Sequence, residues 1–131
     1  MKLLDTSGLY SYFDNDDSFH ARAVEYFDAS DSMLVTDYVL AEFIPLCQVR
    51  NLNRKKTLAF VEEILASPFI EKVWTTENHY VEALELLKAR PDKTYSLCDA
   101  VSFILMRENA ISEAVTTDRH FKQEGFIRLL E

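Results

Sequence analysis

Residues 1–10 read Met-Lys-Leu-Leu-Asp-Thr-Ser-Gly-Leu-Tyr, and their first seven positions decide the fold that we expect. The apolar run Met1–Leu4 ends directly in Asp5, Thr6 and Ser7, which are residue types that favour helix N-termini. A short apolar run without polar alternation is typical of a parallel strand that is buried on both faces. The start of the chain therefore predicts a buried strand followed at once by a helix.

The same order of a short apolar run and a helical pattern returns along the chain. Further strands are predicted at residues 33–36, 69–74, 114–116 and 126–129. The segments between them carry apolar residues at helical spacing and begin after polar residues that can cap a helix, such as Asp37 and Ser96. Pro45 falls inside one helical pattern and is expected to kink or interrupt it, because proline lacks the backbone N–H.

Strands that alternate with helices favour a parallel sheet with helices on both faces. We therefore expect an α/β fold: a three-layer α/β/α sandwich around a central, mostly parallel sheet of four to five strands. The 131 residues show no linker, repeat or low-complexity tract, so we expect one domain over residues 1–131.

Composition excludes several classes of protein. With only two glycines the chain has neither the dinucleotide-binding nor the P-loop glycine motif. The net charge of −8 argues against general coating of nucleic acid but not against a nuclease, because a bound cation offsets a carboxylate cluster. Cys47 and Cys98 form no C-x-x-C pair and are expected to be reduced and partly buried. No segment approaches the ~20 apolar residues of a membrane span, and we expect a cytoplasmic protein.

Four acidic residues stand where solvated acids are not expected. Asp5 closes the first strand and Asp118 follows the fourth, and the carboxyl ends of parallel strands meet at the ligand-binding edge of a sheet. Glu42 and Asp99 interrupt apolar helical stretches. Burying four carboxylates without partners would be very costly. Oxygen ligands without a His or Cys cluster indicate a hard divalent cation, Mg²⁺ or Mn²⁺.

Each acid also has an ordinary structural interpretation. Asp5 and Asp118 could cap the helices that follow them. Glu42 could reach solvent or pair with a cation such as Arg50. Asp99 could complete a capping box with Ser96 and lie in the first turn of its helix. The coincidence of all four favours the metal site.

These residues resemble the PIN-domain family, and the VapC-type toxins in particular. Four motifs in the same order carry the resemblance across essentially the whole chain: Leu3–Ser7, Val39–Phe43, Ser96–Phe103 and Thr116–Phe121 followed by Gly125-Phe126. The resemblance implies that Asp5, Glu42, Asp99 and Asp118 hold the metal and carry catalysis. It also implies supporting hydroxyls at Thr6 or Ser7 and at Thr116 or Thr117.

The resemblance further implies a Mg²⁺- or Mn²⁺-dependent endoribonuclease that leaves 5′-phosphate and 3′-hydroxyl ends. Such proteins are often toxins paired with a small antitoxin, and a homodimer is implied as well. Two alternatives stay open: a PIN-domain nuclease that processes RNA or cuts DNA without a toxin role, and a non-catalytic PIN-like binding module.

Contacts to RNA are harder to predict. Arg119, next to Asp118, is the preferred candidate for a phosphate contact, whereas His120 is expected to be a surface or capping residue. Other basic residues could hold the RNA backbone or simply cover solvated helix faces: Arg50, Arg54, Lys55, Lys56, Arg90 and Lys93. The aromatic residues Tyr10, Tyr12, Phe13, Trp74 and Tyr80 are expected in the core or at a protein interface rather than under bases.

Overall fold

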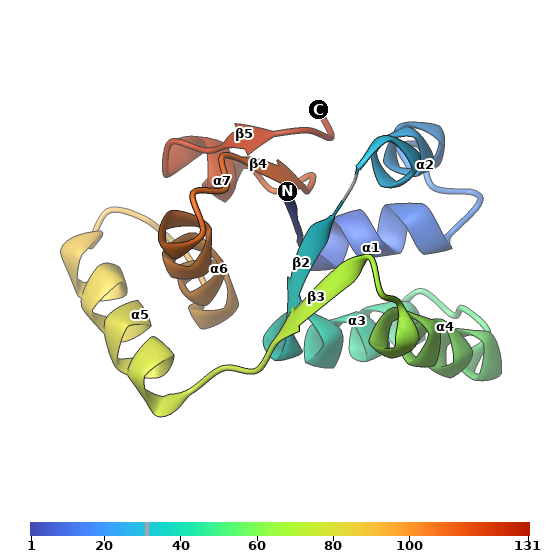
Figure 1. The fold of residues 1–131 in the computed structure, drawn as a ribbon, viewed down its shortest axis with the longest axis horizontal. Coiled ribbons are helices and arrows are strands. Elements are labelled where there is room, and N and C mark those ends of the chain that lie inside the picture. The colour runs from blue at the N-terminus through green and yellow to red at the C-terminus, as the bar shows by residue number, and fades with distance from the viewer. Residues whose placement is uncertain (31) are drawn as a thin grey trace.

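A computed structural model describes residues 1–30 and 32–131 and contains five strands and seven helices in that range (Figure 1). The strands are β1 (Lys2–Leu4), β2 (Met33–Thr36), β3 (Ile70–Val73), β4 (Glu113–Val115) and β5 (Ile127–Arg128). The helices are α1 (Thr6–Phe13), α2 (His20–Ala29), α3 (Asp37–Val49), α4 (Arg54–Ala66), α5 (Glu77–Ala89), α6 (Leu97–Glu108) and α7 (Arg119–Gln123). Within this range every helix is too short or too polar to cross a membrane.

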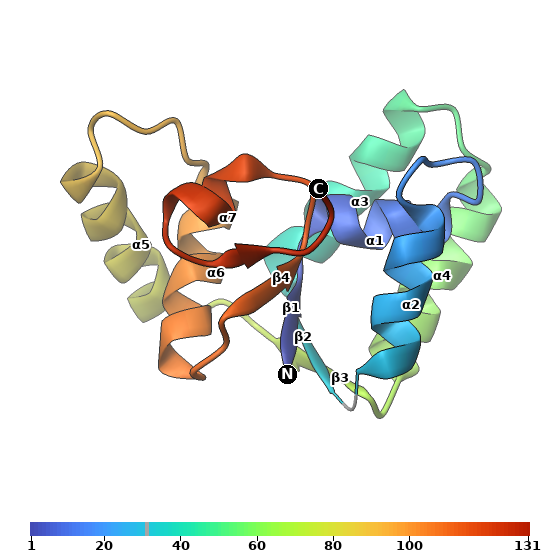
Figure 2. The ribbon, with the colours of Figure 1, turned by 90° about the horizontal axis from the view of Figure 1, so that it is seen from above.

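The five strands form one sheet in the order β3-β2-β1-β4-β5, and all four pairings are parallel. The chain moves outward from β1 to β3 and then returns to the other side of β1. Because crossovers between parallel strands are right-handed, this reversal puts the two sets of helices on opposite faces. Figure 2 shows α1 to α4 on one face and α5 to α7 on the other. The expected three-layer sandwich with a parallel sheet is confirmed.

Alternate residues of the central strands feed two separate cores. Leu4 and Val115 pack with the helices on the face of α1 to α4. Leu3, Leu34 and Ala114 pack on the other face beside Phe103 of α6. Both faces are buried, which explains why these strands are short apolar runs without alternation. The same pattern in Met1–Leu4 is the basis on which the sequence predicts the first strand.

Helix α3 runs through Pro45, so of the two outcomes expected there, a kink or an interruption, the interruption is wrong. Proline removes the bond that residue 45 would donate to the carbonyl of Ala41. Both Ala41 and Pro45 are exposed, so water can satisfy that carbonyl. Hydration lowers the cost of the lost hydrogen bond, and the apolar side chains of the helix, such as Phe43, keep it docked on the core.

Helix α1 crosses β4 so closely that only glycine fits at position 8. A Cβ built on Gly8 would lie 1.9 Å from the carbonyl oxygen of Val115 and 2.7 Å from its carbonyl carbon. These are backbone atoms of a buried strand, which cannot move aside as a flexible side chain would. The contact holds the start of α1 against the end of β4, beside the acidic residues described below.

We therefore expect Gly8→Ala to lower the free energy of unfolding by about 3 kcal/mol, the cost of overpacking a well-packed core. Urea denaturation followed by circular dichroism measures this loss. Gly125→Ala is the matched control, because nothing lies within 4 Å of a Cβ there and only its positive φ of 96° opposes the change. A Gly8→Ala protein as stable as the wild type would contradict the close approach.

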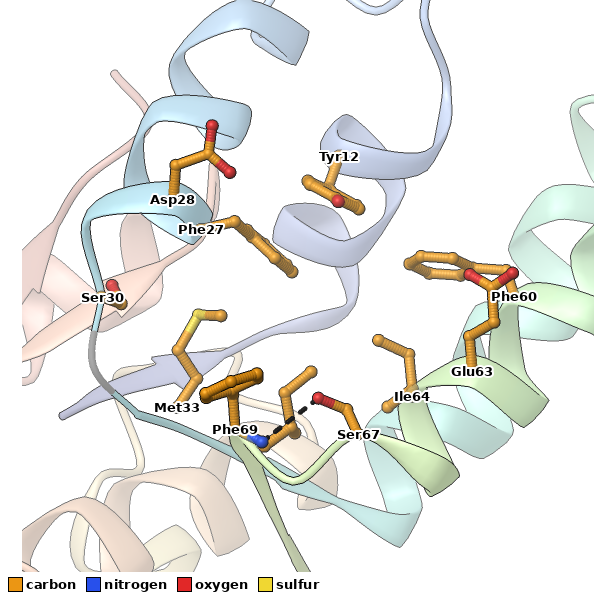
Figure 3. Close-up of a pocket in the computed structure, with 11 residues that line it drawn as sticks. Tyr12, Phe27, Asp28, Ser30, Met33, Phe60, Glu63, Ile64, Ser67 and Phe69 are labelled. Carbon is orange, nitrogen blue, oxygen red and sulfur yellow. Dashed lines mark hydrogen bonds between the residues drawn. The ribbon is translucent and has the colours of Figure 1, made fainter.

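A pocket of about 430 Å³ opens between α1, α2, α4 and the amino ends of β2 and β3 (Figure 3). Its wall includes Tyr12 and Phe27, whose rings stack 4.0 Å apart, together with Phe60 and Met33. Tyr12 thus packs against largely apolar side chains, as expected from the sequence. Trp74 and Tyr80, in contrast, are exposed.

Candidate metal centre

A cleft of about 720 Å³ lies at the carboxyl ends of β1 and β4, where the order of the sheet reverses. This is the position at which open parallel sheets bind ligands. The four acids singled out in the sequence, which come from four separate segments, all line this cleft: Asp5, Glu42, Asp99 and Asp118. The structure thus brings the four residues together in one cleft, and their roles as ligands stay a prediction.

Asp5 is held by hydroxyl groups rather than by a helix end. It occupies the N-cap position of α1, yet its side chain makes no cap hydrogen bond. Instead the hydroxyl of Thr116 donates to Asp5 Oδ2 at 2.7 Å, and Ser7 Oγ lies 3.4 Å from the same oxygen. Ser7 and Thr116 are themselves 3.1 Å apart. The capping interpretation of Asp5 is therefore wrong, and the hydroxyl groups at positions 7 and 116 support this carboxyl group.

Asp99 does form the capping box that the sequence allowed. Its backbone N–H donates to Ser96 Oγ at 3.0 Å, and its Oδ2 accepts from the backbone N–H of Ser96 at 3.1 Å. The same Oδ2 lies 3.0 Å from Nδ1 of His120. The capping role and a role in the cleft are thus compatible, because one carboxylate serves both.

Asp118 caps α7, with Oδ1 accepting from the backbone N–H of His120 at 2.9 Å. Its own backbone N–H donates to the hydroxyl of Thr116 at 3.0 Å. Thr116 therefore contacts both Asp5 and Asp118 and fixes their spacing. Thr117 takes part through its backbone N–H, which donates to Ser7 Oγ at 2.9 Å.

The position of Glu42 shows that one part of the burial prediction is wrong. Its apolar neighbours in the sequence suggested a buried carboxylate, but the residue is exposed at the edge of the cleft. The hydroxyl of Thr6 donates to its Oε2 at 3.1 Å. Only Asp5 and Asp99 are buried, at 5% and 7% exposure, so the electrostatic cost rests on two carboxylates rather than four.

The electrostatics of the cleft disfavour negative charge. The pKa of Asp5 is raised from 3.8 to about 7, mainly by burial and also by the charges of Asp99 and Asp118, while the hydrogen bond from Thr116 opposes the shift. Burial also raises the pKa of Asp99, and Asp118 adds to the shift. The pKa of the Cys98 thiol is raised by burial and then by the charges of Glu42, Asp5 and Asp99, so it stays protonated.

These residues fit a divalent cation. Side-chain atoms of Asp99, Asp118 and His120 lie within 4.8 Å of one another, and Asp5 and Glu42 line the same cleft outside this group. Carboxylates whose pKa values are raised by burial and by each other are the groups that a bound cation would stabilise. The donor set is rich in oxygen, as Mg²⁺ and Mn²⁺ require.

The basic residues divide into those near the cleft and those engaged elsewhere. Among the described residues that line the cleft, Arg50 is the only lysine or arginine, and its guanidinium lies 4.7 Å from the centre of the Tyr10 ring. Arg119 is exposed. Arg90 pairs with Glu124 through two bonds of 3.0 and 3.1 Å, so its assignment to the RNA backbone is not supported.

Glu124 is the centre of a network that the sequence did not reveal. Its side chain is 2% exposed and also accepts bonds from Arg107 and from the hydroxyl of Tyr95. Burial alone would raise the pKa of Glu124, but the hydrogen bonds from Arg90, Arg107 and Tyr95 lower it overall. The network ties α7 to the end of α6 and to the loop before Ser96, and so braces the wall of the cleft that carries Asp99 and Asp118.

The chain is similar to known proteins in sequence and in fold. The model of the PIN domain family matches residues 2–126. The chain is 28% identical over 125 residues to "Ribonuclease VapC26" of Mycobacterium tuberculosis, covering 91% of this chain and 88% of that protein. The crystal structure of Mycobacterium tuberculosis VapC20, described as a "Sarcin-Ricin loop cleaving toxin", matches it with a TM-score of 0.90 at 24% identity and covers 100% of both chains. The family model spans nearly the whole chain, and the protein therefore belongs to the PIN domain family.

Proposed function

We propose that this protein is a divalent-metal-dependent endoribonuclease and the toxin of a toxin–antitoxin pair. One observation carries the proposal: acids from four separate segments, at positions 5, 42, 99 and 118, line a single cleft at the reversal point of the sheet. The relatives named above, a ribonuclease and an RNA-cleaving toxin, support the same class of substrate. Mg²⁺ or Mn²⁺ is the proposed cofactor, and a small antitoxin and a second copy of the chain are the proposed protein partners.

When bound in this cleft, a divalent cation would supply Lewis-acid chemistry, polarising the phosphodiester and lowering the pKa of a water molecule. The residues of the chain would hold the cation, orient one another and accept a proton from water. Asp99 and Asp118 bind from the wall formed by α6 and α7, and the backbone N–H of Ser96 orients Asp99. Thr116 orients Asp5, whose carboxylate would accept a proton from the attacking water. In-line attack by water would leave 5′-phosphate and 3′-hydroxyl ends.

The test is cleavage of single-stranded and structured RNA by the purified protein. We expect internal cuts with Mg²⁺ or Mn²⁺, no cuts with EDTA, and restored activity when the metal is added back, because the carboxylates cannot activate water without a cation. Product ends that carry a 5′-phosphate would support the proposed direction of attack. Intact RNA under all metal conditions, or equal cleavage in EDTA, would disprove the nuclease.

Two further experiments distinguish the proposed toxin from a DNA nuclease and from an RNA-processing enzyme. Single-stranded DNA of the same sequence should stay intact, whereas cleavage of DNA at an equal rate would favour the DNA nuclease. Induced expression should arrest bacterial growth, and the Asp99→Asn variant should not. Cleavage of RNA in vitro without growth arrest would favour a processing enzyme.

A further inference from the structure

His120 is the residue whose position departs most from expectation. The sequence suggested a surface or capping residue, but the imidazole is largely buried against the acidic group. Its Nδ1 lies 3.0 Å from Asp99 Oδ2 and 3.3 Å from Asp118 Oδ1. On the other side of the ring, Nε2 lies 3.2 Å from the hydroxyl oxygen of Thr94. Nδ1 thus faces two carboxylates, whereas Nε2 faces a neutral hydroxyl group.

The hydrogen-bond partners of the imidazole ring decide whether Nδ1 points at the acids with a lone pair or with an N–H. A neutral imidazole carries one N–H and one lone pair. If Nε2 donates its N–H to Thr94, the lone pair of Nδ1 points at two carboxylates. That arrangement is repulsive unless a cation lies between them. Histidines that bind metals typically donate their other N–H to a nearby acceptor in this way, which fixes the tautomer and the orientation of the ring.

The distances match neighbouring ligands of one metal ion. Two ligand atoms bound at about 2.1 Å and at right angles are about 3.0 Å apart, and in a tetrahedral site they are about 3.4 Å apart. The separations of Nδ1 from Asp99 Oδ2 and Asp118 Oδ1 fall in this interval. The ring is also held in place, because its centre lies 5.2 Å from that of Tyr95 at an interplanar angle of 64°.

The geometry points to a metal centre with a nitrogen ligand, in which Nδ1 of His120 binds the ion together with Asp99 and Asp118. This inference rests on the proposed function and refines it. Carboxylates and water suit Mg²⁺ well, whereas an imidazole nitrogen favours transition metals. The site therefore selects Mn²⁺ over Mg²⁺, and Thr94 and Tyr95 position the histidine.

The test uses the full-length protein loaded with Mn²⁺ alone. Pulsed electron paramagnetic resonance detects the coupling of Mn²⁺ to a directly bound nitrogen. We expect this coupling in the wild type and its loss in His120→Gln. The variant should also bind Mn²⁺ at least tenfold more weakly, a typical effect of disturbing metal-site residues, while its affinity for Mg²⁺ changes by less than threefold. His20→Gln is the matched control, because His20 contacts the carbonyl of Ser11 outside the cleft and its loss should leave the coupling intact.

Several results would overturn the inference. Mn²⁺ bound without a nitrogen coupling would mean that His120 only donates a hydrogen bond to Asp99. A coupling that persists in His120→Gln, or the absence of any Mn²⁺ binding, would also reject it. None of these readouts depends on RNA cleavage. Failure of the nuclease assay with the coupling present would reject the proposed function alone, and cleavage without the coupling would reject the nitrogen ligand alone.

Discussion

We expect the Asp99→Asn variant to lose RNA cleavage by a factor of about a thousand or more, equivalent to about 4 kcal/mol of transition-state stabilisation. Asp99 lies in the group of three potential ligands and is the one whose Oδ2 contacts His120. Asparagine removes the negative charge that a cation needs. Its amide oxygen can still accept the backbone N–H of Ser96, so the capping box and the fold should remain.

Rates of cleavage under saturating Mn²⁺, together with circular dichroism and urea denaturation, measure both parts of this prediction. Asp16→Asn is the matched control, because Asp16 is an exposed residue in the turn after α1 and lies outside the cleft. It should retain wild-type activity. Full activity in Asp99→Asn would mean that the cation is not held where we propose.

The Asp5→Asn variant should abolish cleavage and yet stabilise the metal-free protein at pH 8. The pKa of Asp5 is about 7 in the folded protein, compared with an ordinary value of 3.8. Between these values the folded state keeps a proton that the unfolded state has released. The contribution of Asp5 to the stability of the wild type therefore falls as the pH rises between these values, by about 1.4 kcal/mol per pH unit, and this loss ends above pH 7.

Asparagine does not ionise and can accept the same bond from Thr116. The difference in stability between variant and wild type should grow from near zero at pH 4 to about 4 kcal/mol at pH 8. Urea denaturation in EDTA at several pH values measures it, and Asp16→Asn should show no such divergence. With saturating Mn²⁺ the wild type should regain more stability by binding than the variant, which lacks the negative charge of one of the carboxylates in the cleft. Equal stabilities of Asp5→Asn and wild type at pH 5 and pH 8 would contradict the burial effect.

The sequence predicted the fold well because the central strands obey a simple rule. Leu3 and Leu4 face opposite cores, so a run with no polar residue is what a strand of this kind needs. Pro45 showed the limit of such rules. Whether a proline interrupts a helix depends on the exposure of the carbonyl that it leaves unpaired. The sequence around Pro45 does not show which side of the helix faces water.

The candidate site was predictable in its acids but not in its other partners. Asp5 and Asp118 could be placed because strand ends meet at one edge of the sheet. Glu42 misled the burial argument, since apolar neighbours in sequence do not determine which helix face is covered. His120 and the Glu124 network depend on contacts across α6, α7 and the loop before Ser96, which local sequence patterns do not encode.

The four acids that line one cleft are spread from the first strand almost to the end of the chain. During synthesis, a partial chain that ends at α5 has no β4 to pair with β1 and has neither α6 nor α7. That partial product contains Asp5 and Glu42 but lacks the opposite wall of the cleft. The proposed nuclease would therefore stay inactive until the ribosome has synthesised the chain beyond Asp118.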